Sequence, residues 1–274
     1  MLSLLALCAA LFALSAQASN TWKFTNECWP SDPHYADHRF SDGLTWGEFL
    51  AQGLNVRLED YALAGATTNN SLVQGWTGRD LTFPVPSILN QIAQYLAHNP
   101  QPSTKELYTL FAGMNDFLFG SNGVDPSESV ASLGSGMHQL TDAGAQYILL
   151  CTLPSPLGWP YLQYNPSAQP FLSNFTSHFR TALYGLDTNP NQTIIVDMWA
   201  LFEQIYSHPE IYAFSPEKLG EACLVGAYGE TPQVTVCAAP SEYVWWDEFN
   251  PSNATQFYMG SLAFSSLKQV GWVQ

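Results

Sequence analysis

The sequence predicts an α/β fold in which a mainly parallel sheet is covered by helices on both faces. Short apolar runs, typical of buried strands, alternate along the chain with longer segments of helical periodicity. Apolar residues make up 46% of the 274 residues, which is enough for one sizeable core and one domain. A polar motif that directly follows a strand is therefore expected at the carboxyl edge of the sheet, where open α/β folds bind ligands.

The expected helices and strands alternate regularly, with Pro and Gly marking the connections between them. Residues 30–43 and 154–170 form long connections, and loops of this length are often functional. In chain order, we expect a helix at residues 44–53, a strand at 56–61, a helix at 86–98, a strand at 107–112, a helix at 127–143, a strand at 147–152, a helix at 170–184, a strand at 193–197, and a final helix after Asn253.

The chain begins with an uncharged apolar run at residues 2–14. Ala16-Gln17-Ala18 follows it and has the small-x-small form that signal peptidase cuts. The run is too short to span a bilayer, so residues 1–18 are predicted to be a secretion signal and the protein to be extracellular. Because no Lys or Arg precedes the run, a buried strand or helix of the domain is the alternative.

The charge excludes some partners. The net charge is −15, with only eight Lys and Arg residues, whereas nucleic acids and anionic membrane surfaces need clustered cations. An acid-tolerant secreted protein fits this composition better. Sequons compatible with N-glycosylation begin at Asn69, Asn174, Asn191 and Asn253.

The cysteines suggest one disulfide. Cys223 and Cys237 bracket a Gly-rich loop that is short enough to be closed by a bond between them. Cys8 would leave with the signal. Cys28 and Cys151 either pair or stay free, and Cys151, at the end of an apolar run, fits a small buried residue.

Two motifs offer hydrogen-bond donors at the carboxyl edge of the sheet. Gly113-Met114-Asn115-Asp116 directly follows the strand at 107–112, and Asn115 supplies a side-chain amide. Gly65 follows the strand that ends at Tyr61 and allows a backbone N–H to approach a ligand. Each motif alone is a common turn or close-packing sequence. Together, they provide the two converging donors of an oxyanion hole.

A third motif lies before the final helix. Asp247 and Asn250 are three residues apart, a spacing that places both side chains on one side of a turn. In a Ser-His-Asp arrangement, the aspartate orients an imidazole that takes the proton of the nucleophile. Asn250 has no basic nitrogen to do so. The alternative role for both residues is a turn and helix N-cap, which suits Asn250 before Pro251.

These blocks, in this order, resemble the secreted GDSL (SGNH) ester hydrolases of fungal type, similar to acetylesterases that act on carbohydrate esters. The resemblance begins near Ser19 and reaches the C-terminus. Three further segments carry it: Arg39-Phe40-Ser41-Asp42-Gly43-Leu44-Thr45-Trp46 resembles R-F-S-N-G-x-x-W, Ala66-Thr67-Thr68-Asn69-Asn70 continues the second block, and Trp245-Trp246-Asp247-Glu248-Phe249 resembles the approach to the family's histidine.

The resemblance implies an SGNH-like three-layer α/β/α fold whose five-stranded, mainly parallel sheet has the order 2-1-3-4-5. Gly65 and Asn115 would be oxyanion donors, Asp247 the residue that orients the histidine, and Asn250 would stand at the histidine position. The expected substrate is a small ester or acylated carbohydrate, with short acyl groups such as acetyl, and no cofactor or metal is implied. The oligomeric state is not indicated.

The nucleophile block of the family, F-G-D-S, does not occur in the chain. Ser19-Asn20-Thr21 stands where the following G-N-T-like stretch belongs, which places Leu14 opposite the nucleophile, with Ser15 one position away. Residues 19–274 would then form a domain without its usual first, central strand. Either the start of the chain derives from a mispredicted first exon, or residues 6–13 are retained and fill the strand position. Unpaired strand edges would otherwise be costly.

Two substitutes for the missing base are conceivable in the long loop before Arg39. His34 and His38 lie there, although histidines in such loops are usually solvated. A metal site from His34, Asp37 and His38 is disfavoured, because no fourth ligand is apparent. The sequence therefore predicts an ester-hydrolase scaffold, with a catalytically inactive secreted glycan-binding protein or a decayed pseudoenzyme as the alternative. The chain's Trp and Tyr residues supply material for stacking on sugar rings.

Overall fold

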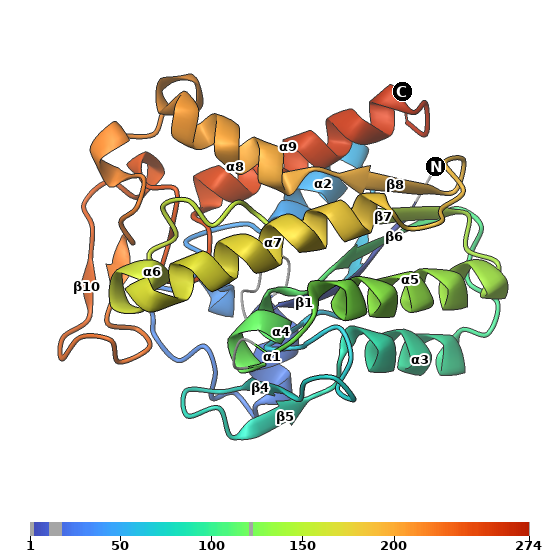
Figure 1. Ribbon diagram of the computed structural model, residues 1–274, viewed down its shortest axis with the longest axis horizontal. Helices are drawn as coiled ribbons and strands as arrows, with labels where there is room; N and C mark the ends of the chain where they lie inside the picture. Colours follow the sequence, from blue (N-terminus) through green and yellow to red (C-terminus); the bar gives the residue numbers. More distant parts are fainter. Residues whose placement is uncertain (1–2, 11–17, 121–122, 274) are drawn as a thin grey trace.

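A parallel sheet forms the centre of the molecule (Figure 1). The computed structural model describes residues 3–10, 18–120 and 123–273. Strands of the sheet run in the order β2-β1-β6-β7-β8, which is 2-1-3-4-5 along the chain, as the resemblance implies. The bounds of these strands are Ser3–Ala10 for β1, Leu58–Asp60 for β2, Glu106–Phe111 for β6, Tyr147–Cys151 for β7 and Thr193–Val196 for β8.

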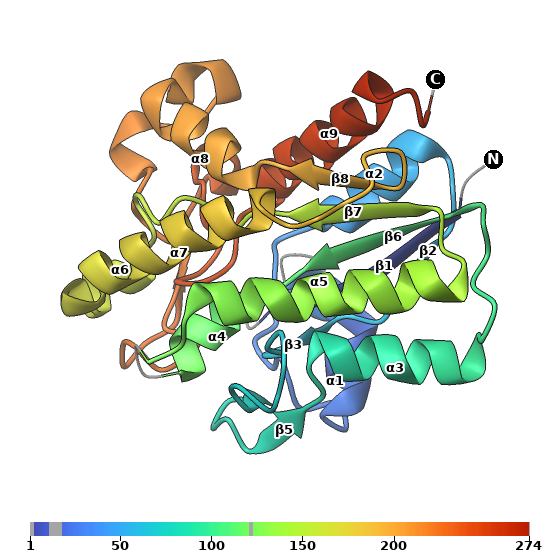
Figure 2. The same cartoon turned by 45° about the vertical axis from the view of Figure 1, so that its right-hand side comes forward.

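Helices cover both faces of the sheet, so the α/β class is confirmed (Figures 1 and 2). Helices α3 (Ile88–His98), α5 (Pro126–Ala143) and α7 (Gln169–Tyr184) lie side by side on one face. Helices α2 (Trp46–Leu54) and α9 (Asn253–Gln269) pack together on the other face. Within the described residues, no helix has both the length and the apolar character that a membrane span requires.

Local sequence explains the ends of these elements. Strand β6 is buried from Leu107 onward, as expected for a strand covered on both faces. Asp125 begins α5 by accepting a hydrogen bond from Ser127 N at 2.8 Å, with Pro126 in the first turn, and Gly144 ends the helix at a φ of +116°. Ser87 begins α3 in the same way, since its Oγ accepts from Asn90 N.

The central strand comes from the apolar run at the start of the chain. Strand β1 lies between β2 and β6, and Leu5 pairs with Glu59 on one side and with Tyr108 on the other. This arrangement corresponds to the second of the two alternatives, in which the apolar run itself fills the strand position. The strand is shifted toward the N-terminus relative to the expected residues 6–13. The domain therefore has a central strand within this chain.

The sheet has six strands instead of the expected five. Strand β3 (Leu63–Ala64) pairs with Ala9 and Ala10 of β1, beyond the stretch where β1 pairs with β2. Between β2 and β3, the Asp60 side chain accepts a hydrogen bond from Ala62 N at 2.8 Å. This local turn interrupts the strand and lets the chain return to β1.

The sequence did not predict several short elements. Helix α4 is only six residues long, and α8 begins where Asp197 accepts a hydrogen bond from Ala200 N. Periodicity is weak over such lengths. The additional elements are α1 (Ala18–Phe24), β4 (Gly75–Thr77), β5 (Phe83–Val85), α4 (Met114–Phe119), α6 (Tyr161–Tyr164), α8 (Met198–Ser207), β9 (Leu224–Val225), β10 (Thr235–Val236), and the 3₁₀ helices Ala36–His38, Pro166–Ala168, Pro209–Tyr212, Pro216–Lys218 and Pro240–Glu242.

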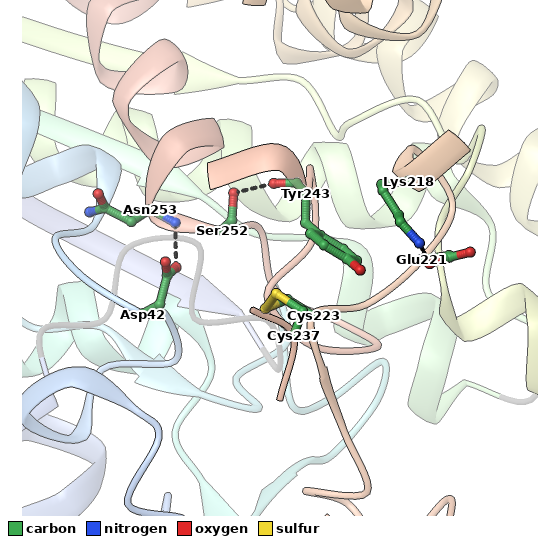
Figure 3. The surroundings of a disulfide bond; sticks show 8 residues. All are labelled: Asp42, Lys218, Glu221, Cys223, Cys237, Tyr243, Ser252 and Asn253. Atoms are coloured by element: carbon green, nitrogen blue, oxygen red, sulfur yellow. Dashed lines mark hydrogen bonds and ion pairs between the residues drawn. A yellow bond between two sulfur atoms is a disulfide. The ribbon is translucent and has the colours of Figure 1, made fainter. Parts of the chain in front are cut away.

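The predicted disulfide between Cys223 and Cys237 is present, with a Cα–Cα distance of 4.8 Å (Figure 3). It ties β9 to the loop that precedes the Asp247 motif. Cys28 carries a free and exposed thiol, so the pairing of Cys28 with Cys151 does not occur. Cys151 is buried at the end of β7, as its apolar surroundings indicated.

Candidate active site

Asp116 joins the Gly113–Asp116 motif to the segment that follows Gly65. Its carboxylate accepts hydrogen bonds from Thr68 N at 2.9 Å, from Thr68 Oγ1, and from Ser129 Oγ at 2.9 Å. Burial raises the pKa of Asp116, while these hydrogen bonds oppose the shift. Asp116 therefore fixes the loop after β3 against α4, the short helix that follows β6.

Asn115 contacts Ala66, the residue that follows Gly65. Its Nδ2 donates to Ala66 O at 2.8 Å, and its side chain is fully buried. Gly65 has a φ of +89°, and Gly113 has a φ of +126° where a Cβ would collide with the ring of Phe179. The structure thus brings Gly65 and Asn115 together. Their role as oxyanion donors stays a prediction, because this amide donates to Ala66.

Asp247 and Asn250 form one tight turn. Asp247 Oδ1 accepts hydrogen bonds from Phe249 N at 2.7 Å and from Asn250 N at 2.6 Å. The side-chain amide of Asn250 faces the same carboxylate, with Nδ2 at 2.9 Å from Oδ2. The expected placement of both side chains on one side of a turn is confirmed, and both residues are fully buried.

Asn250 does not cap the final helix. The N-cap of α9 is Ser252, whose Oγ accepts a hydrogen bond from Thr255 N at 3.3 Å. The capping role expected for Asn250 is therefore wrong, because the helix begins beyond Pro251 and Ser252 supplies the acceptor. Asn250 uses its amide as a donor to Asp247.

Two tyrosines contact this turn, and no local sequence pattern marks either of them as a site residue. Tyr35 OH donates to Asp247 Oδ2 at 2.7 Å, and Asn250 Nδ2 also donates to Tyr228 OH at 3.1 Å. Burial raises the pKa of Asp247 to about 6, against the lowering effect of the hydrogen bonds from Asn250 and Tyr35. Burial and the Asp247 charge raise the pKa of both tyrosines, so their hydroxyls remain protonated donors at neutral pH.

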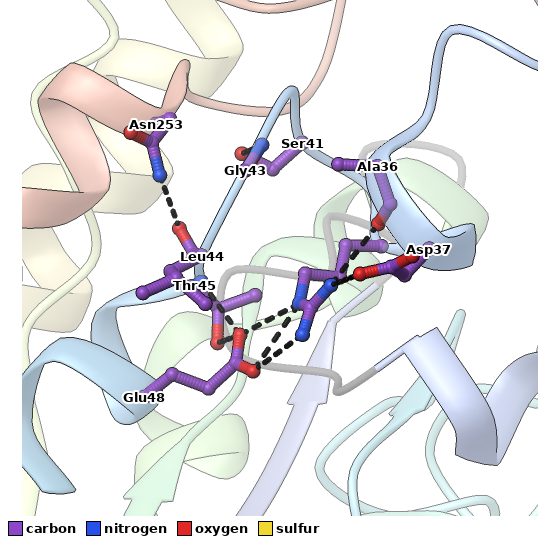
Figure 4. A network of polar contacts seen from close by, with 9 residues as sticks. Ala36, Asp37, Ser41, Gly43, Leu44, Thr45, Glu48 and Asn253 are labelled. Atoms are coloured by element: carbon purple, nitrogen blue, oxygen red, sulfur yellow. Dashed lines mark hydrogen bonds and ion pairs between the residues drawn. The ribbon is translucent and has the colours of Figure 1, made fainter. Parts of the chain in front are cut away.

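A network of polar contacts fixes the segment that resembles R-F-S-N-G-x-x-W (Figure 4). Arg39 donates to Glu48 through Nε at 2.9 Å and Nη2 at 2.9 Å, and Glu48 Oε2 accepts from Thr45 N at 2.9 Å. These contacts fix the segment to the start of α2.

Asn253 connects this segment to the last motif. Asn253 N donates to Asp42 Oδ1 at 2.6 Å, and Asn253 Nδ2 donates to Leu44 O at 3.2 Å (Figures 3 and 4). Ser252, the preceding residue, donates to Tyr243 O at 2.6 Å. The Asp247–Asn250 turn is therefore held between the start of α9 and the loop before α2.

The Gly113–Asp116 motif and the Asp247–Asn250 turn both contribute a residue to one small cavity. It has a volume of about 10 Å³, close to the minimum for one water molecule. Met114, the neighbour of Asn115, and Phe249, the neighbour of Asn250, both line it, together with Trp159 and Trp245. The residues predicted for the site thus approach one another at the same edge of the sheet.

The histidines proposed as substitute bases make other contacts. His34 Nδ1 lies 2.6 Å from Asp32 Oδ1 at the surface, and His38 stacks on Trp22 with ring centroids 3.7 Å apart. Tyr35, between them in sequence, is the residue that reaches Asp247. Among the described residues, no group of three His, Cys, Asp or Glu side chains is arranged to hold a metal ion.

Among the described residues, Asp247 has the side chains of Asn250 and Tyr35 as partners in place of an imidazole. Asn250 cannot accept a proton from a hydroxyl near neutral pH, so Asp247 has no imidazole to orient. Leu14 and Ser15, which the family pattern places at and beside the nucleophile, lie outside the described residues.

A family comparison agrees with this scaffold. The family described as "GDSL-like Lipase/Acylhydrolase" matches residues 18–263. The chain therefore belongs to the GDSL-like lipase/acylhydrolase family, whose members are ester hydrolases.

The chain has low sequence identity to individual members of known function or structure. The chain is 26% identical to a thermolabile hemolysin of Vibrio parahaemolyticus, over 90% of this chain and 59% of that protein. It is 24% identical to an acetylesterase of Hypocrea jecorina, over 83% of this chain and 77% of that protein. A crystal structure of a lipolytic G-D-S-L family member from Veillonella parvula has a TM-score of 0.53 over all of both chains, at 10% identity, which shows a shared fold.

Proposed function

We propose that this chain is an ester-hydrolase domain adapted to short acyl groups, such as acetyl, on carbohydrate, and that Asn250 reduces its turnover to a low residual level. The Asp247–Asn250 turn carries this proposal. It keeps the aspartate, the spacing and the buried position that a histidine would need, and it lacks the base. Similarity to an acetylesterase supports the acyl class. In a triad enzyme stripped of its triad, binding and the oxyanion hole leave about 10³-fold acceleration over water.

A glycan-binding protein without catalysis is the second candidate. It is favoured by one observation, namely that the Asn250 amide is fully engaged with Asp247 and Tyr228. In this role, the site around Asp247 and Asn250 would hold a carbohydrate without cleaving it. The two candidates differ only in whether the ester bond is broken.

The deciding experiment restores the missing groups. The variant carries Asn250→His together with Phe12→Gly, Ala13→Asp and Leu14→Ser, and it is compared with the natural chain on 4-nitrophenyl acetate. A rate rise of at least about 10³-fold is expected when nucleophile and base return together. Asp247→Asn in the restored background should remove most of that gain, because the imidazole loses its orienting partner. A folded restored variant with no gain contradicts the esterase scaffold.

We further propose that the protein acts outside the cell and carries N-glycans. The acidic composition and the disulfide support an oxidising compartment. Asn174 and Asn191 are exposed and suit glycosylation, whereas Asn253 is engaged with Leu44. Mass spectrometry of the secreted protein, before and after endoglycosidase treatment, tests both statements.

A further inference from the structure

A larger cavity lies beside the Asp247–Asn250 turn and shares the ring of Phe249 with the small one. Its volume is about 220 Å³. Trp29, Tyr228 and Phe249 form apolar walls, while Glu248, Arg79 and Thr77 contribute polar groups. Tyr228 also accepts the hydrogen bond from Asn250, so the cavity adjoins the position of the family's histidine.

The aromatic walls meet nearly at right angles. The rings of Trp29 and Tyr228 have centroids 5.3 Å apart and planes inclined by 72°. The rings of Tyr228 and Phe249 have centroids 4.8 Å apart and planes inclined by 88°. Aromatic walls of this kind offer large apolar surfaces against which the C–H face of a ligand ring can pack.

Glu248 is the unexplained polar group of this cavity. Glu248 lines the cavity, and the residue is 6% exposed. Burial, followed by the charges of Glu230 and Asp247, raises the pKa of Glu248 to about 8. A carboxyl group that lines a cavity with apolar walls can hydrogen-bond a hydroxyl of a bound ligand, which favours ligands that carry one.

Arg79 and Thr77 add hydrogen-bond donors to the lining of the cavity. The Arg79 side chain is exposed and forms no ion pair with the described residues, and its guanidinium has five N–H donors. Thr77 is buried in β4. The polar groups thus include donors and acceptors around apolar walls, which suits a ring that carries hydroxyl groups.

Size also favours a ring. An engineered cavity of about 150 Å³ holds benzene. A cavity of about 220 Å³ therefore accommodates a six-membered ring with substituents. An acetyl group or a small ammonium ion would leave much of it unfilled.

We propose that this cavity is a subsite for an uncharged pyranose ring on the alcohol side of the ester, stacked in the Trp29–Tyr228–Phe249 corner and hydrogen-bonded by Glu248 and Arg79. This inference rests on the proposed function, because it assigns the carbohydrate part of that substrate. Its specificity-determining residue is Glu248. When protonated, Glu248 both donates and accepts a hydrogen bond.

The protonation of Glu248 gives the site a pH dependence. A bound ring removes the remaining water, which makes the ionised carboxylate less favourable, so affinity falls as the pH rises through about 8. Arg79 is the cation of the cavity, and its exposure leaves it screened by solvent. The other titratable groups facing Glu248 are Glu230, Asp247, Tyr161, Tyr164 and Tyr228.

Calorimetric titration of the full chain with free xylose and glucose tests the proposal. We expect a dissociation constant in the millimolar range, weakened about tenfold by Glu248→Leu and about threefold by Arg79→Ala. Arg57→Ala and Glu242→Gln, at exposed positions away from the cavity, should leave it unchanged. Between pH 6 and pH 9, affinity should drop at least about threefold in the natural chain and stay constant in Glu248→Gln.

Several outcomes would overturn the subsite. One is that the folded protein binds no sugar at concentrations up to about 100 mM. Another is that sugar affinity is unchanged by Arg79→Ala and, at both pH values, by Glu248→Gln. A third is that the protein binds tetramethylammonium or cyclohexanol more tightly than the sugars. Binding is measured without hydrolysis, so an inactive chain that binds sugar retains the subsite. A restored variant that cleaves aryl acetate without sugar binding retains the proposed function alone.

Discussion

Asn250 Nδ2 lies 3.0 Å from Oδ1 and 2.9 Å from Oδ2 of Asp247, so one amide group bridges both oxygens of a fully buried carboxylate. This is the contact that an imidazole N–H would make in a working triad. The substitution therefore keeps the aspartate satisfied while removing the base. The turn is stable as a structural unit without being able to activate a hydroxyl.

Removing the Tyr35 hydroxyl should weaken this unit. Tyr35→Phe deletes the donor to Asp247 Oδ2 while keeping the ring in the core. Hydrogen bonds to charged groups contribute about 1.5–3 kcal/mol, so the free energy of unfolding at pH 7 should fall by about 2 kcal/mol. Urea unfolding measures the change. Tyr164→Phe, at an exposed ring, is the control, and equal stability of the two variants would contradict the role of Tyr35.

Glu248 should make stability depend on pH. Its pKa rises from 4.5 to about 8 in the folded state, so the folded protein holds a proton that the unfolded chain releases. The contribution of Glu248 to the free energy of unfolding is fully present below about pH 4.5 and is lost as the pH rises through about 8. Each pKa unit corresponds to about 1.4 kcal/mol. Glu248→Gln should therefore match the natural chain at pH 4.5 and exceed it by about 2 kcal/mol or more at pH 8.5.

Urea unfolding at both pH values checks this prediction. Glu242→Gln, an exposed carboxyl-to-amide change, should leave the pH profile unaltered. A constant difference between Glu248→Gln and the natural chain at both pH values would show that Glu248 titrates normally.

The disulfide should contribute measurably to stability. Cys223 and Cys237 are 14 residues apart, and closing a loop of about this length contributes about 3 kcal/mol. Cys223→Ala with Cys237→Ala should lower the free energy of unfolding by about that amount. The single change Cys28→Ser, at an exposed free thiol, should have little effect. Unfolding with and without reductant provides the measurement, and a reductant effect that persists in the double variant would contradict the assignment.

Sequence patterns predicted what depends on neighbours in the chain. Helix α5 was expected at 127–143 from its helical periodicity, and β6 from its apolar run. Tyr35 was missed because it contacts Asp247 across 212 residues, which no local pattern reveals. Glu248 lies inside a recognised motif, and only the fold shows that its side chain faces a cavity.

The apolar run at the start of the chain has two physical interpretations, and one substitution separates them. Leu5 pairs through its backbone with β2 and β6, and proline at this position removes an N–H from the middle of the sheet. If residues 3–10 belong to the folded protein, Leu5→Pro should prevent folding or destabilise it by about 3 kcal/mol or more. Leu5→Val, which keeps the N–H and favours strands, should be tolerated. Circular dichroism and N-terminal sequencing of the secreted products give the measurement. A folded product that begins at Ser19 and is indifferent to Leu5→Pro would show that the segment acts as a leader and that the central strand comes from elsewhere.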